Sequence, residues 1–179
     1  MTEKTLSKSD FQLASTCEQK LLYKKRGYPT AGDSDGYMQM LSDGGYMVGK
    51  MATLLQKDGI EISADRTEDC VNQTRNWLAN TDKGTLFEAA ILSNQKLVRI
   101  DILKKKGNRL HLIEVKAKSF DSTATEAKIL EDIDEYIDDV AYQYMVLKEA
   151  YSDFEIECSL LMPDKAKRTT IDGLAGWFR

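Results

Sequence analysis

Cysteine, proline and histidine are scarce in this sequence of 179 residues, and long apolar runs are missing. It has only three cysteines, two prolines and one histidine. Cys17, Cys70 and Cys158 are far apart and form no C-x-x-C pair, so the spacing indicates neither a zinc knuckle nor a disulfide framework. No apolar run approaches the ~20 residues that cross a bilayer. The N-terminal stretch MTEKTLSKSD lacks the apolar core of a secretory signal. We therefore expect a cytoplasmic protein with no membrane partner.

Positive charge is also too scarce for a surface that binds nucleic acid over its whole area. The formal net charge is −4, which leaves room only for a local basic groove. Much of the acidity lies in residues 126–139, which hold seven acidic residues and one lysine. We expect this stretch to be the solvated face of a helix that repels DNA. Basic residues cluster instead at 24–26, at 104–106 and at Lys116 and Lys118.

The periodicity predicts an α/β protein with a mixed sheet flanked by helices. A capping box at Ser7–Asp10 begins a helix that continues to about Arg26. We expect further helices within 35–57, broken at Gly44-Gly45, and over 65–79, 126–151 and 170–178. The predicted strands are 85–92, 97–105, 110–118 and 154–162. Short turns make the first three strands an antiparallel meander, and the long helix returns the last strand parallel to the third by a right-handed crossover.

This order predicts one domain over 1–179 with three parts. Residues 1–82 form a helical N-terminal part, 83–163 form the core with its crossover helix, and 164–179 form a C-terminal helix. The large apolar groups at the end, Trp177-Phe178, are compatible with a longer protein of which this is the N-terminal part.

The hairpin between the second and third strands brings two acidic residues together. If Gly107-Asn108 is a two-residue turn, Lys106 pairs with Arg109, and the same register puts Asp101 opposite Glu114. It also puts Arg99 opposite Lys116, so these four side chains share one polar face. The other face carries Val98, Ile100, Ile102, Ile113 and Val115, which we expect to pack against helices.

Two chemical interpretations of this polar face remain open. Opposed side chains have Cβ atoms ~4.5–5.5 Å apart, and like charges at that separation repel each other. A divalent cation such as Mg²⁺ would remove the repulsion between Asp101 and Glu114, and Lys116 could then hold a phosphate oxygen or help to activate water. In the alternative, the face is solvated and Arg99 and Lys116 neutralise the two acids.

Four motifs follow one another along the sequence: LFEAA at 86–90, RIDIL at 99–103, IEVK at 113–116 and AYQY at 141–144. This ordered set resembles the RecB-like, CRISPR-associated exonuclease-like branch of the PD-(D/E)XK nucleases. The opening segments LSKSDF at 6–11 and CEQKLLY at 17–23 are also similar to the start of such nucleases, and to nuclease domains at the front of long bacterial proteins. The resemblance implies a restriction-endonuclease-like core.

The resemblance also implies roles for individual residues. Asp101 and Glu114 would bind Mg²⁺ or Mn²⁺, with the Val115 carbonyl as a further ligand and Glu88 as an additional carboxylate. Lys116 would be the catalytic lysine, and Gln143 would support the site or the DNA strand.

The sequence departs from this family at two places. The stretch GYMVGK at 45–50 offers neither the acid nor the histidine that such nucleases usually carry on an early helix. Cys17 matches the early cysteine of relatives with an iron–sulfur cluster, but no late cysteine trio follows, so we expect no such cluster within this chain.

We therefore predict a Mg²⁺- or Mn²⁺-dependent deoxyribonuclease that acts on DNA ends or single strands. The candidate nucleic-acid contacts are Lys24, Lys25, Arg26, Arg99 and Lys118. The alternative is a catalytically weak or inactive nuclease-fold domain that binds DNA or a protein partner within a larger repair or phage-defence protein. His111 lies off the Glu114 face in this register, which favours a structural or solvent role for it.

Overall fold

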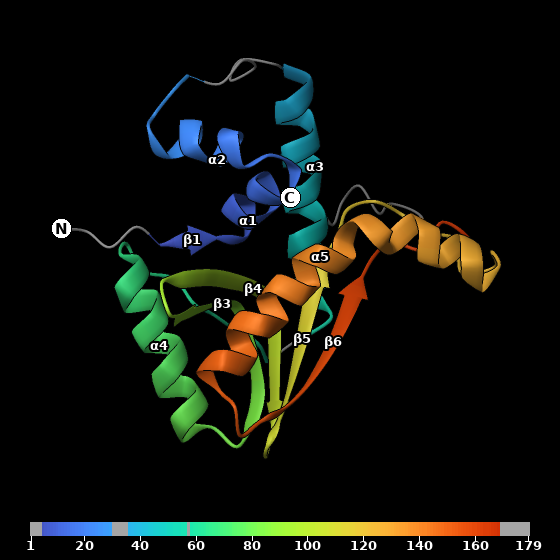
Figure 1. Ribbon diagram of the computed structural model, residues 1–179. Coiled ribbons are helices and arrows are strands. Elements are labelled where there is room, and N and C mark those ends of the chain that lie inside the picture. Colours follow the sequence, from blue (N-terminus) through green and yellow to red (C-terminus); the bar gives the residue numbers. More distant parts are fainter. Residues whose placement is uncertain (1–4, 30–35, 57, 169–179) are drawn as a thin grey trace.

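The computed structural model describes residues 5–29, 36–56 and 58–168, and Figure 1 shows their arrangement. The elements in chain order are β1 (Leu6–Ser7), α1 (Lys8–Thr16), α2 (Glu18–Lys25), α3 (Gly36–Leu54), β2 (Ile60–Glu61), α4 (Thr67–Asn80), β3 (Lys83–Ser93), β4 (Lys96–Lys106), β5 (Arg109–Val115), α5 (Glu126–Ala150) and β6 (Glu155–Leu161). The helix expected over 170–178 lies outside the described residues.

The sheet confirms the predicted α/β class. Its strand order is β2-β3-β4-β5-β6, with β1 paired to β4 off this path. Strands β3, β4 and β5 form the antiparallel meander, and α5 leads to β6, which pairs parallel to β5. The sequence predicted only this one parallel strand. The two-residue strands β1 and β2 add parallel pairings to β4 and β3, and they are too short to leave a periodic signal.

The N-terminal helix is divided in two, contrary to the single helix expected up to Arg26. The capping box predicted at Ser7 and Asp10 is present, but Cys17 is extended (φ −169°, ψ 116°) and separates α1 from α2. Asp10 is buried and lies 2.9 Å from Lys24 Nζ and 2.7 Å from Lys25 Nζ. These two ion pairs across the break hold α2 against α1.

Helix α3 is continuous through Gly44-Gly45, so the break predicted there is wrong. A glycine inside a helix costs about 1 kcal/mol relative to alanine but does not forbid the conformation. The C-terminal half of α3 is also held by tertiary packing, because Ala52 is buried against Phe87, Ile102 and Ile113.

Helices cover the sheet on both faces, and the two faces have separate cores. In Figure 1, α5 runs across the front of the sheet and α4 lies beside β3. The larger core joins these helices to the sheet through residues that include Cys70, Leu78, Leu86, Ile100, Leu103, Leu112, Val146 and Leu147. The smaller core joins the other face to α3 through Ala52, Phe87, Ile102 and Ile113.

The alternation of faces breaks at Glu88 and Asp101. Ile100 belongs to the larger core, whereas Ile102, two positions on, belongs to the smaller one. The β3–β4 register passes from Phe87–Ile102 to Ala89–Ile100, and Glu88 between them has a φ of 55°. The predicted common face of Val98, Ile100, Ile102, Ile113 and Val115 is therefore wrong, because this distortion divides it between the two cores.

Candidate functional site

The hairpin register predicted from the sequence is confirmed. Lys106 pairs with Arg109, and the ladder continues to Ile102 and Ile113, with Gly107 at the positive φ of 56°. The backbone ladder stops one step before Asp101 and Glu114. There the Val115 N–H donates to Asp101 Oδ2 at 2.7 Å, so a carboxylate takes the place of a strand partner.

Arg99 does not join the polar cluster that the same register predicted. It pairs with Ala90 on β3, and its Nη2 lies 3.5 Å from Cys70 Sγ. The Lys116 N–H donates instead to the Leu161 carbonyl of β6. Arg99 and Lys116 do not pair, because the β4–β5 hydrogen bonding ends at Ile102 and Ile113, where the Asp101 side chain takes the Val115 N–H.

Glu114 is the centre of the site and is only 2% exposed. Its Oε1 lies 2.6 Å from Lys8 Nζ and 2.9 Å from Lys116 Nζ, and its Oε2 accepts a hydrogen bond from Gln143 Nε2 at 2.6 Å. Burial alone would raise the pKa of Glu114, but the charge and hydrogen bond of Lys8 and the hydrogen bonds of Lys116 and Gln143 outweigh it, and the pKa lies below its usual value.

Lys116 is held between two buried carboxylates. Its Nζ lies 2.5 Å from Asp139 Oδ2 as well as 2.9 Å from Glu114, and Gln12 Nε2 donates to the other Asp139 oxygen. Burial would lower the pKa of Lys116, but the hydrogen bonds to Asp139 and Glu114 raise it above 10.5. Asp139 is only 2% exposed, so its assignment to the solvated face of α5 is wrong.

Three residues of this cluster were missed by the sequence analysis: Lys8, Gln12 and Asp139. Asp139 could have been found, because it lies four positions before Gln143 on α5 and residues at that spacing share a helix face. Lys8 and Gln12 come from α1, whose position over the sheet no local pattern specifies.

Asp101 and Glu88 face a different space from Glu114. Both line a pocket of about 420 Å³ between the sheet and α3, together with Lys50 and Glu61. Burial raises the pKa of Asp101 to about 6, and the negative charge of Glu114 adds to the shift. Burial also raises the pKa of Glu88. Asp101 therefore lies between this pocket and the Glu114 cluster.

The predicted set of three metal-binding carboxylates is not assembled. In the part of the chain that the structure describes, no group of three or more His, Cys, Asp or Glu side chains could hold a metal ion. The oxygen donors that remain are Asp101, Glu114 and the Val115 carbonyl. Mg²⁺ prefers such donors and commonly uses only one or two carboxylates, so their chemistry fits that ion, although Lys8 and Lys116 compete for Glu114.

An unpartnered polar atom adjoins this cluster. Gln143 is fully buried, and its Oε1 has no hydrogen-bond partner among the described residues. Buried polar groups are nearly always satisfied, so an exception calls for a water or an ion. The orphaned oxygen belongs to the same amide that donates to Glu114, so a water or cation that satisfied it would adjoin the Glu114 cluster.

The predicted nucleic-acid contacts are largely engaged within the protein. Lys24 and Lys25 bind Asp10, and Lys118 Nζ lies 2.7 Å from Glu135 Oε1. Arg99 is exposed beside Cys70, and Arg26 is the exposed C-cap of α2. His111 lies opposite Lys104, as the register predicted, and its Nε2 is 2.7 Å from Ser159 Oγ.

Comparison with known proteins assigns no family, since no protein-family model and no curated protein matches this chain. None of the helices in the described ranges is both long enough and apolar enough to span a bilayer.

Proposed function

We propose that the protein hydrolyses DNA phosphodiester bonds with the help of a divalent metal ion. The observation that carries the proposal is the arrangement around buried Glu114, which contacts Lys116 through one oxygen and Gln143 through the other and lies beside Asp101. The places of these residues agree with the PD-(D/E)XK resemblance. Asp101 is on the second meander strand, Glu114 and Lys116 are at the end of the third, and Gln143 is on the next helix.

Asp101, Glu114 and the Val115 carbonyl would hold Mg²⁺ or Mn²⁺. The bound ion would polarise the phosphoryl group and lower the pKa of the attacking water. Lys116 would give the scissile phosphate a fixed positive charge, because Asp139 and Glu114 keep its ammonium protonated and in place. Gln143 orients Glu114 through the Nε2 hydrogen bond. With a pKa of about 6, Asp101 is mostly ionised at neutral pH and available to a cation.

The direct test is cleavage of end-labelled single-stranded and duplex DNA by the purified protein. We expect degradation with Mn²⁺ or Mg²⁺ and none in EDTA. Asp101→Ala and Lys116→Ala should each lower the rate by about 100-fold or more, the scale of losing one preorganised charge at a reacting centre. Lys128→Ala, which removes an exposed lysine of α5, is the matched control and should keep the wild-type rate. Circular dichroism of each variant verifies that it is folded.

A non-catalytic nuclease-fold domain is the second candidate, and a specific observation favours it. The two ammonium groups on Glu114 already neutralise that carboxylate, and no third carboxylate joins the pair among the described residues. DNA binding without cleavage in the presence of any divalent ion would support this candidate. Neither binding nor cleavage would favour a protein-interaction domain of a larger repair or phage-defence protein.

A further inference from the structure

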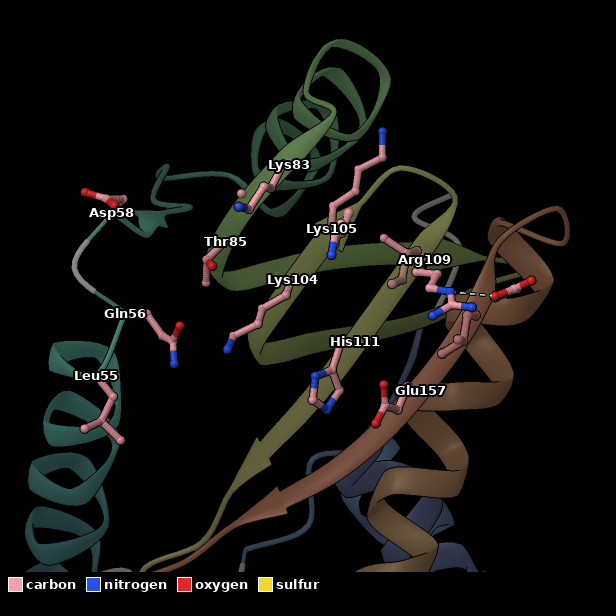
Figure 2. Close-up of a pocket in the computed structure, with 15 residues that line it drawn as sticks. Leu55, Gln56, Asp58, Lys83, Thr85, Lys104, Lys105, Arg109, His111 and Glu157 are labelled. Atoms are coloured by element: carbon pink, nitrogen blue, oxygen red, sulfur yellow. Dashed lines mark hydrogen bonds and ion pairs between the residues drawn. The ribbon is translucent and has the colours of Figure 1, made fainter.

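A second surface, distinct from the carboxylate cluster, has the properties of an anion-binding groove. It is a hollow of about 780 Å³ on the face of the sheet that α3 covers. It lies just past the C-terminal end of α3, over the part of β3, β4, β5 and β6 next to the Gly107-Asn108 turn. Figure 2 shows Leu55 and Gln56 on one side of the hollow and Lys104 and His111 on the strands opposite. We call this hollow the basic groove.

Strand register places the charges of the basic groove in two rows across the sheet. One row is Thr85, Lys104, His111 and Glu157, and the other is Lys83, Lys106, Arg109 and Glu155. The rows are two residues apart along each strand, which is about 7 Å, and neighbouring strands are about 4.8 Å apart. The basic side chains of the two rows are thus spaced both along and across the strands on one face of the sheet, which forms the bottom of the hollow.

The basic groove is positive although the chain is negative. Five lysine and arginine residues line it against three acidic residues, a difference of +2, whereas the whole chain carries −4. Two of the five cations are engaged within the protein. Lys105 donates to the carbonyls of Leu78 and Thr81 at 2.7 Å each, and Arg109 lies 2.8 Å from Glu155.

The other three cations have no such partner among the residues that the structure describes. Within the described ranges, Lys83, Lys104 and Lys106 make neither an ion pair nor a side-chain hydrogen bond. Lys83 and Lys106 are direct cross-strand neighbours on β3 and β4. Like charges directly opposite each other in a sheet are destabilising, so this pair favours an anionic ligand just as two opposed carboxylates favour a cation.

We propose that the basic groove binds the phosphate backbone of single-stranded nucleic acid. A strand of linked phosphates matches lysines that are distributed over two rows better than one compact anion does. Leu55 and the imidazole of His111 add apolar and ring surface to the walls, against which bases can lie. That the anion is a nucleic acid and not another polyanion rests on the proposed function. That the basic groove binds an anion at all rests only on its lysines.

The test is binding of a fluorescein-labelled single-stranded DNA of about 25 nucleotides to the whole protein in EDTA, followed by fluorescence anisotropy at several salt concentrations. The variant Lys83→Gln/Lys104→Gln/Lys106→Gln removes the three lysines for which the described part of the chain supplies no partner. Lys20→Gln/Lys128→Gln/Lys165→Gln removes the same charge from exposed positions elsewhere and controls for the long-range field. We expect the groove variant to lose about tenfold or more in affinity and its log–log salt slope to fall by about 2, or 0.7 per phosphate contact.

A variant with higher affinity tests the proposal in the opposite direction. Glu157 lies beside His111 in the basic groove, so Glu157→Gln should raise the DNA affinity several-fold. Equal losses in the groove and control variants, or a wild-type protein that does not bind this DNA even at low salt, would overturn the proposal. The assay contains no metal, so the result is separate from that of the cleavage test. If the wild-type protein binds DNA through the basic groove but does not cleave it, the proposed function fails and the groove proposal stands. If the wild-type protein cleaves DNA but the groove variant binds it normally, the groove proposal fails and the proposed function stands.

Discussion

Lys8 of α1 places its ammonium 2.6 Å from the Oε1 atom of Glu114 on β5. The contact joins residues more than a hundred positions apart and closes the N-terminal helix over the buried carboxylate. Lys116 shares the same oxygen at 2.9 Å, so two cations already contact one of the two Glu114 oxygens that a divalent ion could bind. Under the proposed function, Lys8 is a competitor of the metal.

Replacing Lys8 should therefore increase metal affinity. In Lys8→Met the aliphatic stem is largely kept and the charge is lost, and we expect Mn²⁺ to bind several-fold more tightly. The electron paramagnetic resonance signal of free Mn²⁺ measures this without reference to activity. Because Lys116 and Gln143 still contact Glu114, the loss in unfolding free energy should stay at about 1–3 kcal/mol. Lys20→Met, on exposed α2, is the control, and equal Mn²⁺ affinity in the two variants would contradict the competition.

The raised pKa of Asp101 makes stability depend on pH. The pKa of Asp101 is about 6 in the folded protein, whereas an ordinary aspartate, as in the unfolded chain, has a pKa of 3.8. The folded state therefore favours the protonated carboxyl group. Its contribution to stability is fully present below pH 3.8 and is lost as the pH rises through about 6. Asp101→Asn keeps an acceptor for the Val115 N–H and cannot ionise. Its stability relative to wild type should therefore increase by about 2 kcal/mol between pH 4.5 and 7.5.

Urea denaturation at the two pH values measures this change. Asp134→Asn, at an exposed position of α5, is the control. It measures how much of the pH-dependent change in stability follows from the loss of any one carboxylate. A relative stability of Asp101→Asn that is flat or falls with pH would mean that the Asp101 carboxylate is favoured as the anion in the folded protein.

Asp139 should act as a positioning residue for Lys116. Asp139→Asn removes the anion 2.5 Å from Lys116 Nζ, so the pKa of Lys116 should fall. We expect a lower cleavage rate and an alkaline limb of the pH–rate profile that moves to lower pH. NMR titration of the lysine side chain follows the same change in the absence of substrate. Asp138→Asn changes the exposed neighbour on α5 and should alter neither profile. A lower rate with an unshifted alkaline limb would assign Asp139 a purely structural role.

Two glycine substitutions should change stability in opposite directions. A Cβ at Gly44, inside continuous α3, meets no atom within 4 Å, so Gly44→Ala should stabilise the protein by about 0.5–1 kcal/mol. A Cβ at Gly59 would lie 2.1 Å from the Phe87 ring, so Gly59→Ala should destabilise it by about 1–3 kcal/mol. Thermal denaturation measures both changes. A destabilising Gly44→Ala would show that α3 is not a regular helix at that point.

The local parts of the fold followed from the sequence. The Ser7 capping box, the Gly107-Asn108 turn and the β4–β5 register were all predicted, because each depends on residues close together in the chain. The errors fall where a distant contact or a special backbone angle intervenes. Cys17 breaks the first helix, and Glu88 at positive φ divides the expected apolar face of β4.

The candidate site divides in the same way. The sequence alone brought Asp101, Glu114 and Lys116 to one end of the hairpin and placed Gln143 on the following helix, since strand register and helix periodicity are local rules. Only the tertiary structure decided that Lys8 and Asp139 share this cluster and that Glu114 faces α5 while Asp101 lines the pocket beside α3. The packing of α1 and α5 on the sheet is set by apolar burial summed over many residues, which no short stretch of sequence specifies.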